Sequence, residues 1–148
     1  MITAIHRSLA KKRETLEEGR EAGFTLVELL VVILIIGILT AIAVPVFLGQ
    51  QDQAKDAAAK SDLGSLKVAV ISFAAANNGT YPATGALTGN ADAAALAELG
   101  YVASEGVTDA TIVSASASGI CLSAKSSSSS GPTFYITDKL GASTTACS

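Results

Sequence analysis

One stretch limits the fold of this chain more than any other. Leu29–Leu48 is a run of 20 residues without a charge, and nearly all of its side chains are apolar. An α-helix needs about 20 such residues to cross the roughly 30 Å hydrocarbon core of a bilayer. Glu28 stands directly before this run. Because a carboxylate near the bilayer centre costs about 3 kcal/mol, we expect Glu28 to have a specific role.

The segment before the run indicates the topology. Residues 1–23 are polar and hold half of the lysines and arginines, so they are typical of a targeting segment. Positive residues next to a spanning helix stay in the cytoplasm, which sends the C-terminal part outward. The cations of this segment are Arg7, Lys11, Lys12, Arg13 and Arg20.

Gly23, Phe24 and Glu28 stand in the order found at the processing site of type IV prepilins. In that family a basic leader ends in Gly, the next residue is usually Phe, and a Glu follows four positions later. The chain therefore resembles the type IV pilin and prepilin family, as a type IVa-like major pilin or a pseudopilin. The resemblance implies that a prepilin peptidase cuts between Gly23 and Phe24 and methylates the new Phe24 amine. It also implies that Glu28 neutralises the Phe24 amine of a neighbouring subunit and sets the register of a filament.

The pattern predicts one long helix, Phe24 to Ala76. Thr25 and Glu28 match an S/T-x-x-E capping box at its start. After Gln50 the apolar residues recur at spacings of 4, 3, 4 and 3, which is one face of a helix. This apolar stripe consists of Ala59, Leu63, Leu66, Val70 and Phe73. Three residues weaken the helix, and we expect a kink near the second of them rather than an end: Gly37, Pro45 and Gly49.

The rest of the chain predicts an α+β head. Asn77-Asn78-Gly79 ends the helix, and this turn also explains the N-x-T match at Asn78. A short helix is expected over 92–99, followed by a small antiparallel sheet packed on the apolar stripe. Its candidate strands are Thr111–Ala115, which is weak, Gly119–Lys125 and Thr133–Asp138. The Ser126–Ser130 run between the last two is interpreted as a flexible turn. The expected domains are a leader (1–23), a transmembrane or filament-core helix (24–49) and a globular head (50–148).

Cys121 and Cys147 fall in the part of the chain that is expected outside, where a disulfide persists. No second pair and no nearby His accompany them, which weighs against a zinc site and leaves free thiols or a bridge. The family commonly closes a C-terminal loop with a disulfide, so the resemblance favours the bridge. Such a bridge would contribute about 3 to 3.5 kcal/mol on the chain-entropy model.

The residue inventory argues against catalysis, a metal or a cofactor. The single histidine, His6, lies in the predicted leader, so no Ser/His or Cys/His arrangement remains after cleavage. The carboxylates of the head are scattered, without the spacing of a calcium loop. The net charge of −3 does not favour nucleic-acid binding, and only Lys125 and Lys139 are basic in the C-terminal half. The scattered carboxylates are Asp92, Glu98, Glu105, Asp109 and Asp138.

The resemblance implies a subunit of an extracellular helical homo-oligomer that serves adhesion, twitching motility or DNA uptake. The precursor would cross the cytoplasmic membrane once, with its N-terminus inside, and an inner-membrane platform would assemble it into a surface pilus. A pseudopilin or minor pilin of a secretion or competence machine is the alternative. Two further alternatives do not involve a filament. One is an ordinary signal anchor with a capped helix; the other is a secreted domain cut after Ala43, in the Ala41-Ile42-Ala43 motif.

Overall fold

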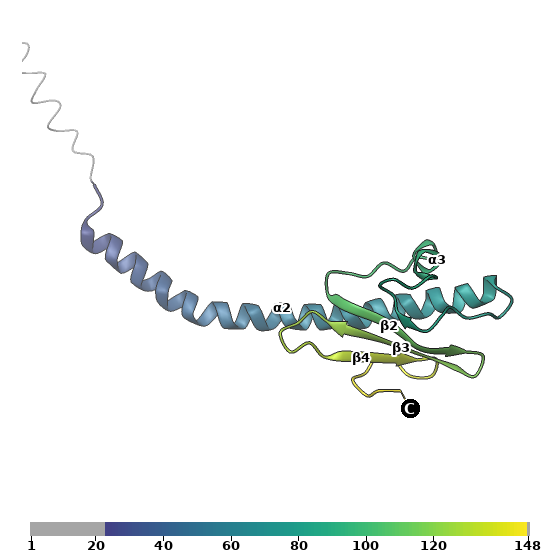
Figure 1. Cartoon of the computed structure of the whole chain (residues 1–148). Helices are drawn as coiled ribbons and strands as arrows, with labels where there is room; N and C mark the ends of the chain where they lie inside the picture. The colour runs from purple at the N-terminus through teal and green to yellow at the C-terminus, as the bar shows by residue number, and fades with distance from the viewer. Residues whose placement is uncertain (1–22, 148) are drawn as a thin grey trace, which may run out of the picture. The chain divides into compact units, whose positions relative to one another are not determined.

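The computed structural model describes residues 23–147, so most of the predicted leader lies outside the described residues. Figure 1 shows a long helix followed by a small sheet. The described chain divides into two units, one ending at Val44 and the other starting at Pro45. This architecture confirms the predicted α+β class. The elements are α2 (Leu26–Ala76), β1 (Gly85–Ala86), α3 (Ala93–Glu98), β2 (Val107–Ser116), β3 (Gly119–Ser126) and β4 (Thr133–Thr137).

Helix α2 runs without interruption for 51 residues, including Pro45. It starts two residues after the predicted Phe24 and ends at the predicted Ala76. Beyond that end, Asn78 and Gly79 adopt positive φ angles of 53° and 83°. The Gly79 amide donates to the carbonyl oxygen of Ala74 at 2.8 Å, which closes the last turn in a left-handed cap.

The four strands form one sheet in the order β1-β2-β3-β4, with antiparallel neighbours throughout. Two features differ from the prediction: β1 was not expected, and β2 covers ten residues instead of five. The polar side chains of Thr108 and Asp109 interrupt the apolar pattern at the start of β2, so the sequence did not predict this part of the strand. This polar start still belongs to the strand because β3 pairs with β2 from Val107 to Ser116, with register shifts at Thr108 and Val113.

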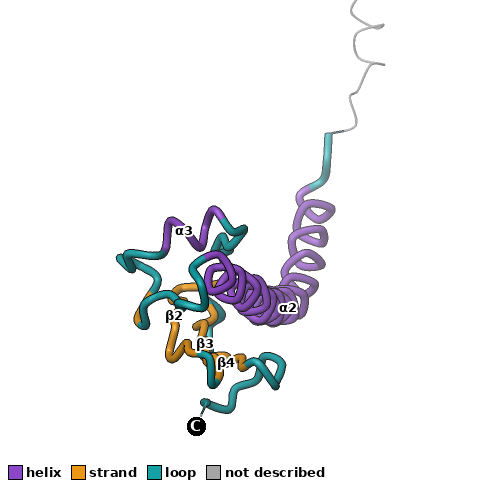
Figure 2. The backbone as a smooth tube through the Cα atoms, turned by 90° about the vertical axis from the view of Figure 1, so that its right-hand side faces the viewer, coloured by secondary structure: helices purple, strands orange, loops and turns teal. Residues whose placement is uncertain are grey.

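The core lies between the inner face of the sheet and the second half of α2. Figure 2 shows the strands on one side of this part of the helix. The predicted stripe faces the sheet, with Phe73 partly buried and the other four members fully buried. Alternation along β3 and β4 directs the facing apolar side chains inward. The buried core comprises Ala59, Leu63, Leu66, Ala69, Val70, Leu96, Tyr101, Ala110, Ile112, Ile120, Leu122, Ala124, Phe134 and Ile136.

The Ser126–Ser130 segment connects β3 to β4 by a turn, as predicted. The turn does not extend freely into solvent, however, because Ser128 and Ser129 bind the first head turns of α2. Ser128 Oγ donates to Asp56 Oδ1 at 2.7 Å, and the Ser129 amide donates to Asp52 Oδ1 at 3.0 Å. The Ser129 hydroxyl also donates to Asp52 Oδ2. Sequence patterns could not reveal these pairs, because their members lie 72 and 77 residues apart.

These bonds predict an acid-sensitive contact. Hydrogen bonds from the side chain and backbone of Ser129 lower the pKa of Asp52, and side-chain bonds from Ser126 and Ser128 lower that of Asp56. A lowered pKa adds stability above the ordinary aspartate value of about 3.9, and this stability is lost as pH falls through the folded-state value. In an NMR titration, the Ser129 amide resonance should therefore shift with a midpoint below that ordinary value.

The Asp52→Asn variant is the matched control for this titration. It keeps an oxygen acceptor but cannot lose a charge, so the pH-dependent shift of Ser129 should fall to the smaller effect that Asp56 transmits through Ser128. A midpoint at or above the ordinary aspartate value in the unmodified chain would contradict the predicted contact.

Gly106 allows the loop before β2 to approach α2 closely. A Cβ at this position would lie 2.6 Å from Cβ of Ala58 and 3.2 Å from the Lys55 carbonyl oxygen, both on the helix. We expect Gly106→Ala to lower the free energy of unfolding by about 1–3 kcal/mol, as overpacking does. Urea unfolding of the full chain in detergent measures this. Gly141→Ala is the control, because its new Cβ meets no atom within 4 Å; equal effects of the two changes would contradict the steric argument.

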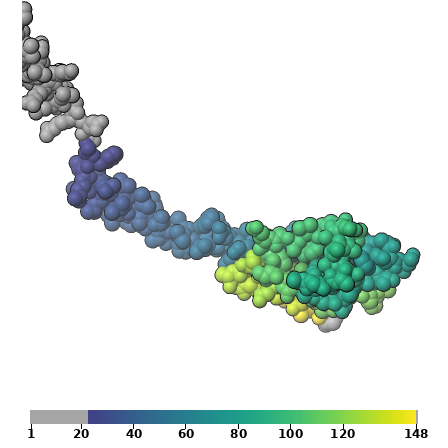
Figure 3. Space-filling view, turned by 45° about the horizontal axis from the view of Figure 1, so that its top comes forward, coloured from purple at the N-terminus to yellow at the C-terminus, as the bar shows by residue number. Residues whose placement is uncertain are grey.

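The C-terminal segment lies beyond β4, on the side of the sheet away from α2 (Figures 1 and 2). Cys121 and Cys147 form the disulfide that the resemblance led us to expect, with a Cα–Cα distance of 6.1 Å. Between them, Tyr135 and Ser143 exchange two backbone hydrogen bonds of 2.7 and 2.9 Å at the open edge of β4. In Figure 3 the yellow C-terminal residues lie at the lower edge of the head.

Candidate processing site and assembly helix

The start of α2 is a capping box, as the sequence predicted. The amide and the hydroxyl of Thr25 both donate to Oε2 of Glu28 at 2.9 Å. In return, the Glu28 amide donates to the Thr25 hydroxyl at 3.2 Å. These reciprocal bonds satisfy amides that the first helical turn leaves free. They occupy one oxygen of the Glu28 carboxylate, and Oε1 has no hydrogen-bond partner within residues 23–147.

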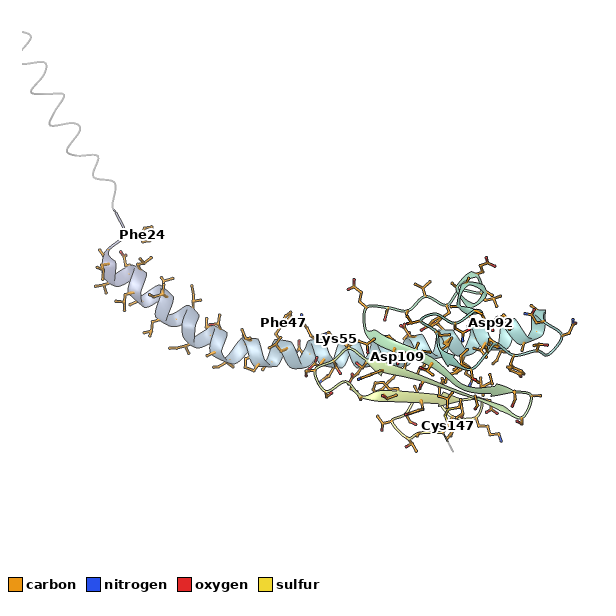
Figure 4. The ribbon with its side chains drawn as sticks, in the orientation of Figure 1. Phe24, Phe47, Lys55, Asp92, Asp109 and Cys147 are labelled. Atoms are coloured by element: carbon orange, nitrogen blue, oxygen red, sulfur yellow. A yellow bond between two sulfur atoms is a disulfide. The ribbon has the colours of Figure 1, made fainter. Side chains whose placement is uncertain are left out.

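The residues directly before α2 are exposed to solvent. Gly23 is exposed and precedes α2, and the Phe24 side chain is 90% exposed (Figure 4). A protease needs an exposed backbone at the bond that it cuts, and a glycine on the N-terminal side of that bond adds no side chain that would hinder approach. Gly23, Phe24 and Glu28 therefore lie together on one short exposed segment.

Within residues 23–147, no other segment covers the apolar run. Every residue from 24 to 48 is exposed, with values of 44% to 77% for the large apolar side chains after Phe24. An exposed apolar surface of this extent marks an interaction with lipid or protein. The most apolar 18-residue window of α2 has a mean hydropathy of 3.1, so the helix is long and apolar enough to cross a membrane.

The backbone and polar groups of the run suit an apolar environment. Thr40 donates its hydroxyl to the carbonyl oxygens of Ile36 and Gly37, at 2.8 and 3.1 Å, so this polar side chain needs no water. Gly37, Pro45 and Gly49 all lie within the continuous helix. The run can therefore be buried all round without leaving the Thr40 hydroxyl unpaired.

The scattered carboxylates are not brought together. In residues 23–147, no group of three or more His, Cys, Asp or Glu side chains is placed to hold a metal ion. Some carboxylates instead bind backbone amides. Asp92 Oδ2 accepts from the Ala83 amide at 2.8 Å, and Asp62 Oδ2 accepts from the Ser104 amide at 2.7 Å. These bonds attach loops to neighbouring elements of the head.

Known proteins share the sequence features of this site. Residues 19–44 match the family model of the prokaryotic N-terminal methylation motif. The chain is 38% identical over 69 residues to type II secretion system core protein G of Pseudomonas aeruginosa, which is 47% of this chain and 48% of the relative. It is 50% identical over 54 residues to the type IV major pilin PilA of Myxococcus xanthus (36% and 24% of the two chains). With PilA5, the major component of the type IV narrow pilus of Thermus thermophilus, it is 63% identical over 38 residues (26% and 33%).

The fold and the site define a pilin-like chain: a long, N-terminally apolar helix followed by a small antiparallel sheet. The comparisons confirm the resemblance to type IV pilins and pseudopilins, and both classes occur among the relatives. The chain spans about half, or less, of the length of the curated relatives it matches.

Proposed function

We propose that this protein is a structural type IV pilin subunit. Its precursor is anchored once in the cytoplasmic membrane with the N-terminus inside, a prepilin peptidase removes residues 1–23, and Phe24 is N-methylated. The inner-membrane assembly platform then transfers residues 24–49 from lipid into the core of a helical filament, with 50–148 as the outer head. The filament serves adhesion, twitching motility or DNA uptake.

The fully exposed apolar run is the observation that carries this proposal. A span of this kind needs cover from lipid before assembly and from other helices afterwards. Glu28 supports the same reading, since its unpaired oxygen is available to the Phe24 amine of a neighbour. Pairing the two charges in a low-dielectric helix bundle removes the cost of leaving either one unpaired.

A pseudopilin of a secretion machine is the second candidate. The similarity to type II secretion core protein G favours it. The Cys121–Cys147 disulfide favours a pilin, because pseudopilins often lack a C-terminal bridge. Abundance separates the two: a major pilin should dominate the filament fraction sheared from cells, and a pseudopilin should be a trace component there.

The N-terminal sequence and intact mass of the sheared protein test the processing. We expect a start at Phe24 with one methyl group on its amine, and a mass lower by two hydrogen atoms for the disulfide. A start at Val44 would indicate cleavage after Ala43 and a soluble secreted domain, and the filament proposal would be abandoned.

A further inference from the structure

A polar pocket lies at the C-terminal end of α2, away from the processing site. Its volume is about 290 Å³, and Figure 4 places Asp92 beside this end of the helix. The pocket is formed by the end of α2, the turn that follows it and the loop before α3. The lining residues are Phe73, Ala76, Asn77, Asn78, Thr80, Tyr81 and Asp92.

The pocket is negatively charged, because Asp92 is the one charged side chain of its lining and no lining residue is basic. The C-terminal end of a helix carries about half a negative charge, and the last turn of α2 contains no basic residue to compensate it. Asp92 adds a carboxylate. The nearest lysine along the helix, Lys67, is used elsewhere: its ammonium group donates to the carbonyl oxygens of Thr137 and Asp138, at 2.8 and 3.1 Å. The pocket therefore favours a cation.

The pocket also offers free acceptors. Asp92 binds the Ala83 amide through Oδ2, and Oδ1 has no hydrogen-bond partner within the described residues. Asn77 donates its side-chain amide nitrogen to the Phe73 carbonyl oxygen at 2.8 Å, which leaves its side-chain oxygen as the acceptor. Phe73 and Tyr81 add aromatic rings, which attract an ammonium group and pack against its alkyl stem.

We propose that this pocket binds a primary alkylammonium group, and that a lysine side chain of another copy of the chain supplies it in the filament. One carboxylate with several neutral oxygens is a weak set for a divalent metal but suits a single positive charge. Lys139 is the donor to test first: it is exposed beside Leu140, which is 67% exposed, whereas the ammonium group of the exposed Lys60 already lies 4.7 Å from the centroid of the Phe134 ring. The assignment of the ligand as an alkylammonium group rests on the pocket alone. The assignment of its source, a second copy of the chain, rests on the proposed function.

Titration with n-butylammonium chloride tests the ligand class on the full chain in detergent micelles. We expect saturable NMR shifts at the amides of Asn77, Asn78 and Tyr81 at millimolar ligand, corrected for sodium chloride of equal ionic strength. Asp92→Asn keeps an acceptor for the Ala83 amide but removes the charge, so binding should weaken about ten-fold. Thr80→Lys places an ammonium group at the pocket and should also reduce binding.

Three outcomes would overturn the ligand class: no saturable shift, equal binding by Asp92→Asn, or displacement of butylammonium by a lower concentration of calcium chloride. The source of the ammonium is tested separately, by carbodiimide cross-linking of intact filaments and mass spectrometry. An Asp92–Lys139 link between copies supports the proposal. A link from Asp92 to another protein, or links at other carboxylates but none at Asp92, would overturn the second copy as the source. If no filament forms at all, the proposed function fails while the monomer titration still decides the ligand class.

Discussion

Glu28→Gln should reduce filament assembly by more than about 100-fold in association constant, while the first turn of α2 stays intact. A glutamine oxygen can still accept both Thr25 bonds, because the capping box tolerates Gln in place of Glu. The negative charge is lost, however, and the Phe24 ammonium of the neighbour is left unpaired among apolar helices. An uncompensated buried charge costs about 3–5 kcal/mol. The amount of pelletable filament per cell, against the amount of subunit in the membrane, measures the effect.

Thr25→Ala is the complementary control. It removes the cap, which costs about 1 kcal/mol of helix stability, but keeps the charge of Glu28. Assembly should persist in this variant. If Glu28→Gln filaments form normally, or if Thr25→Ala is the more severe defect, Glu28 acts only as a helix cap and the register role is wrong.

Replacing both cysteines by alanine should lower the free energy of unfolding by about 3 kcal/mol. The Cys121–Cys147 bond closes a loop over a sequence separation of 26, and a cross-link of this span restricts the unfolded chain by about that amount. Alanine is preferred to serine because Cys121 is buried, and a serine hydroxyl would need a partner there. Urea unfolding of the full chain in detergent gives the value.

The same variant should lose protection at the edge of β4. Without the bridge, the two backbone bonds between Tyr135 and Ser143 have only local contacts to hold them, so their amides should exchange faster with deuterium. A reductant should destabilise the unmodified chain and leave the alanine variant unchanged. A loss of stability below about 0.5 kcal/mol would mean that packing, not the bond, holds the C-terminal segment.

The long helix and its contact face were predictable from local patterns. The capping pair Thr25 and Glu28 lies within one turn, and the turn at Asn78 and Gly79 has a local backbone signature. The spacing of the apolar stripe identified the buried face because a helix repeats every 3.6 residues. The short β1 strand and the first half of β2 were missed, since their backbone bonds come from neighbouring strands and not from their own side chains.

The sequence by itself therefore determined the membrane-length helix, its match to the N-terminal methylation motif and the face that packs on the sheet, because these features depend on neighbours within one or two helical turns. Only the tertiary structure decided that Ser128 and Ser129 bind Asp56 and Asp52, and that Gly106 rests on the helix. It likewise formed the Asp92 pocket at the helix end. Such contacts join residues far apart along the chain, and a folded backbone is needed to bring them within bonding distance.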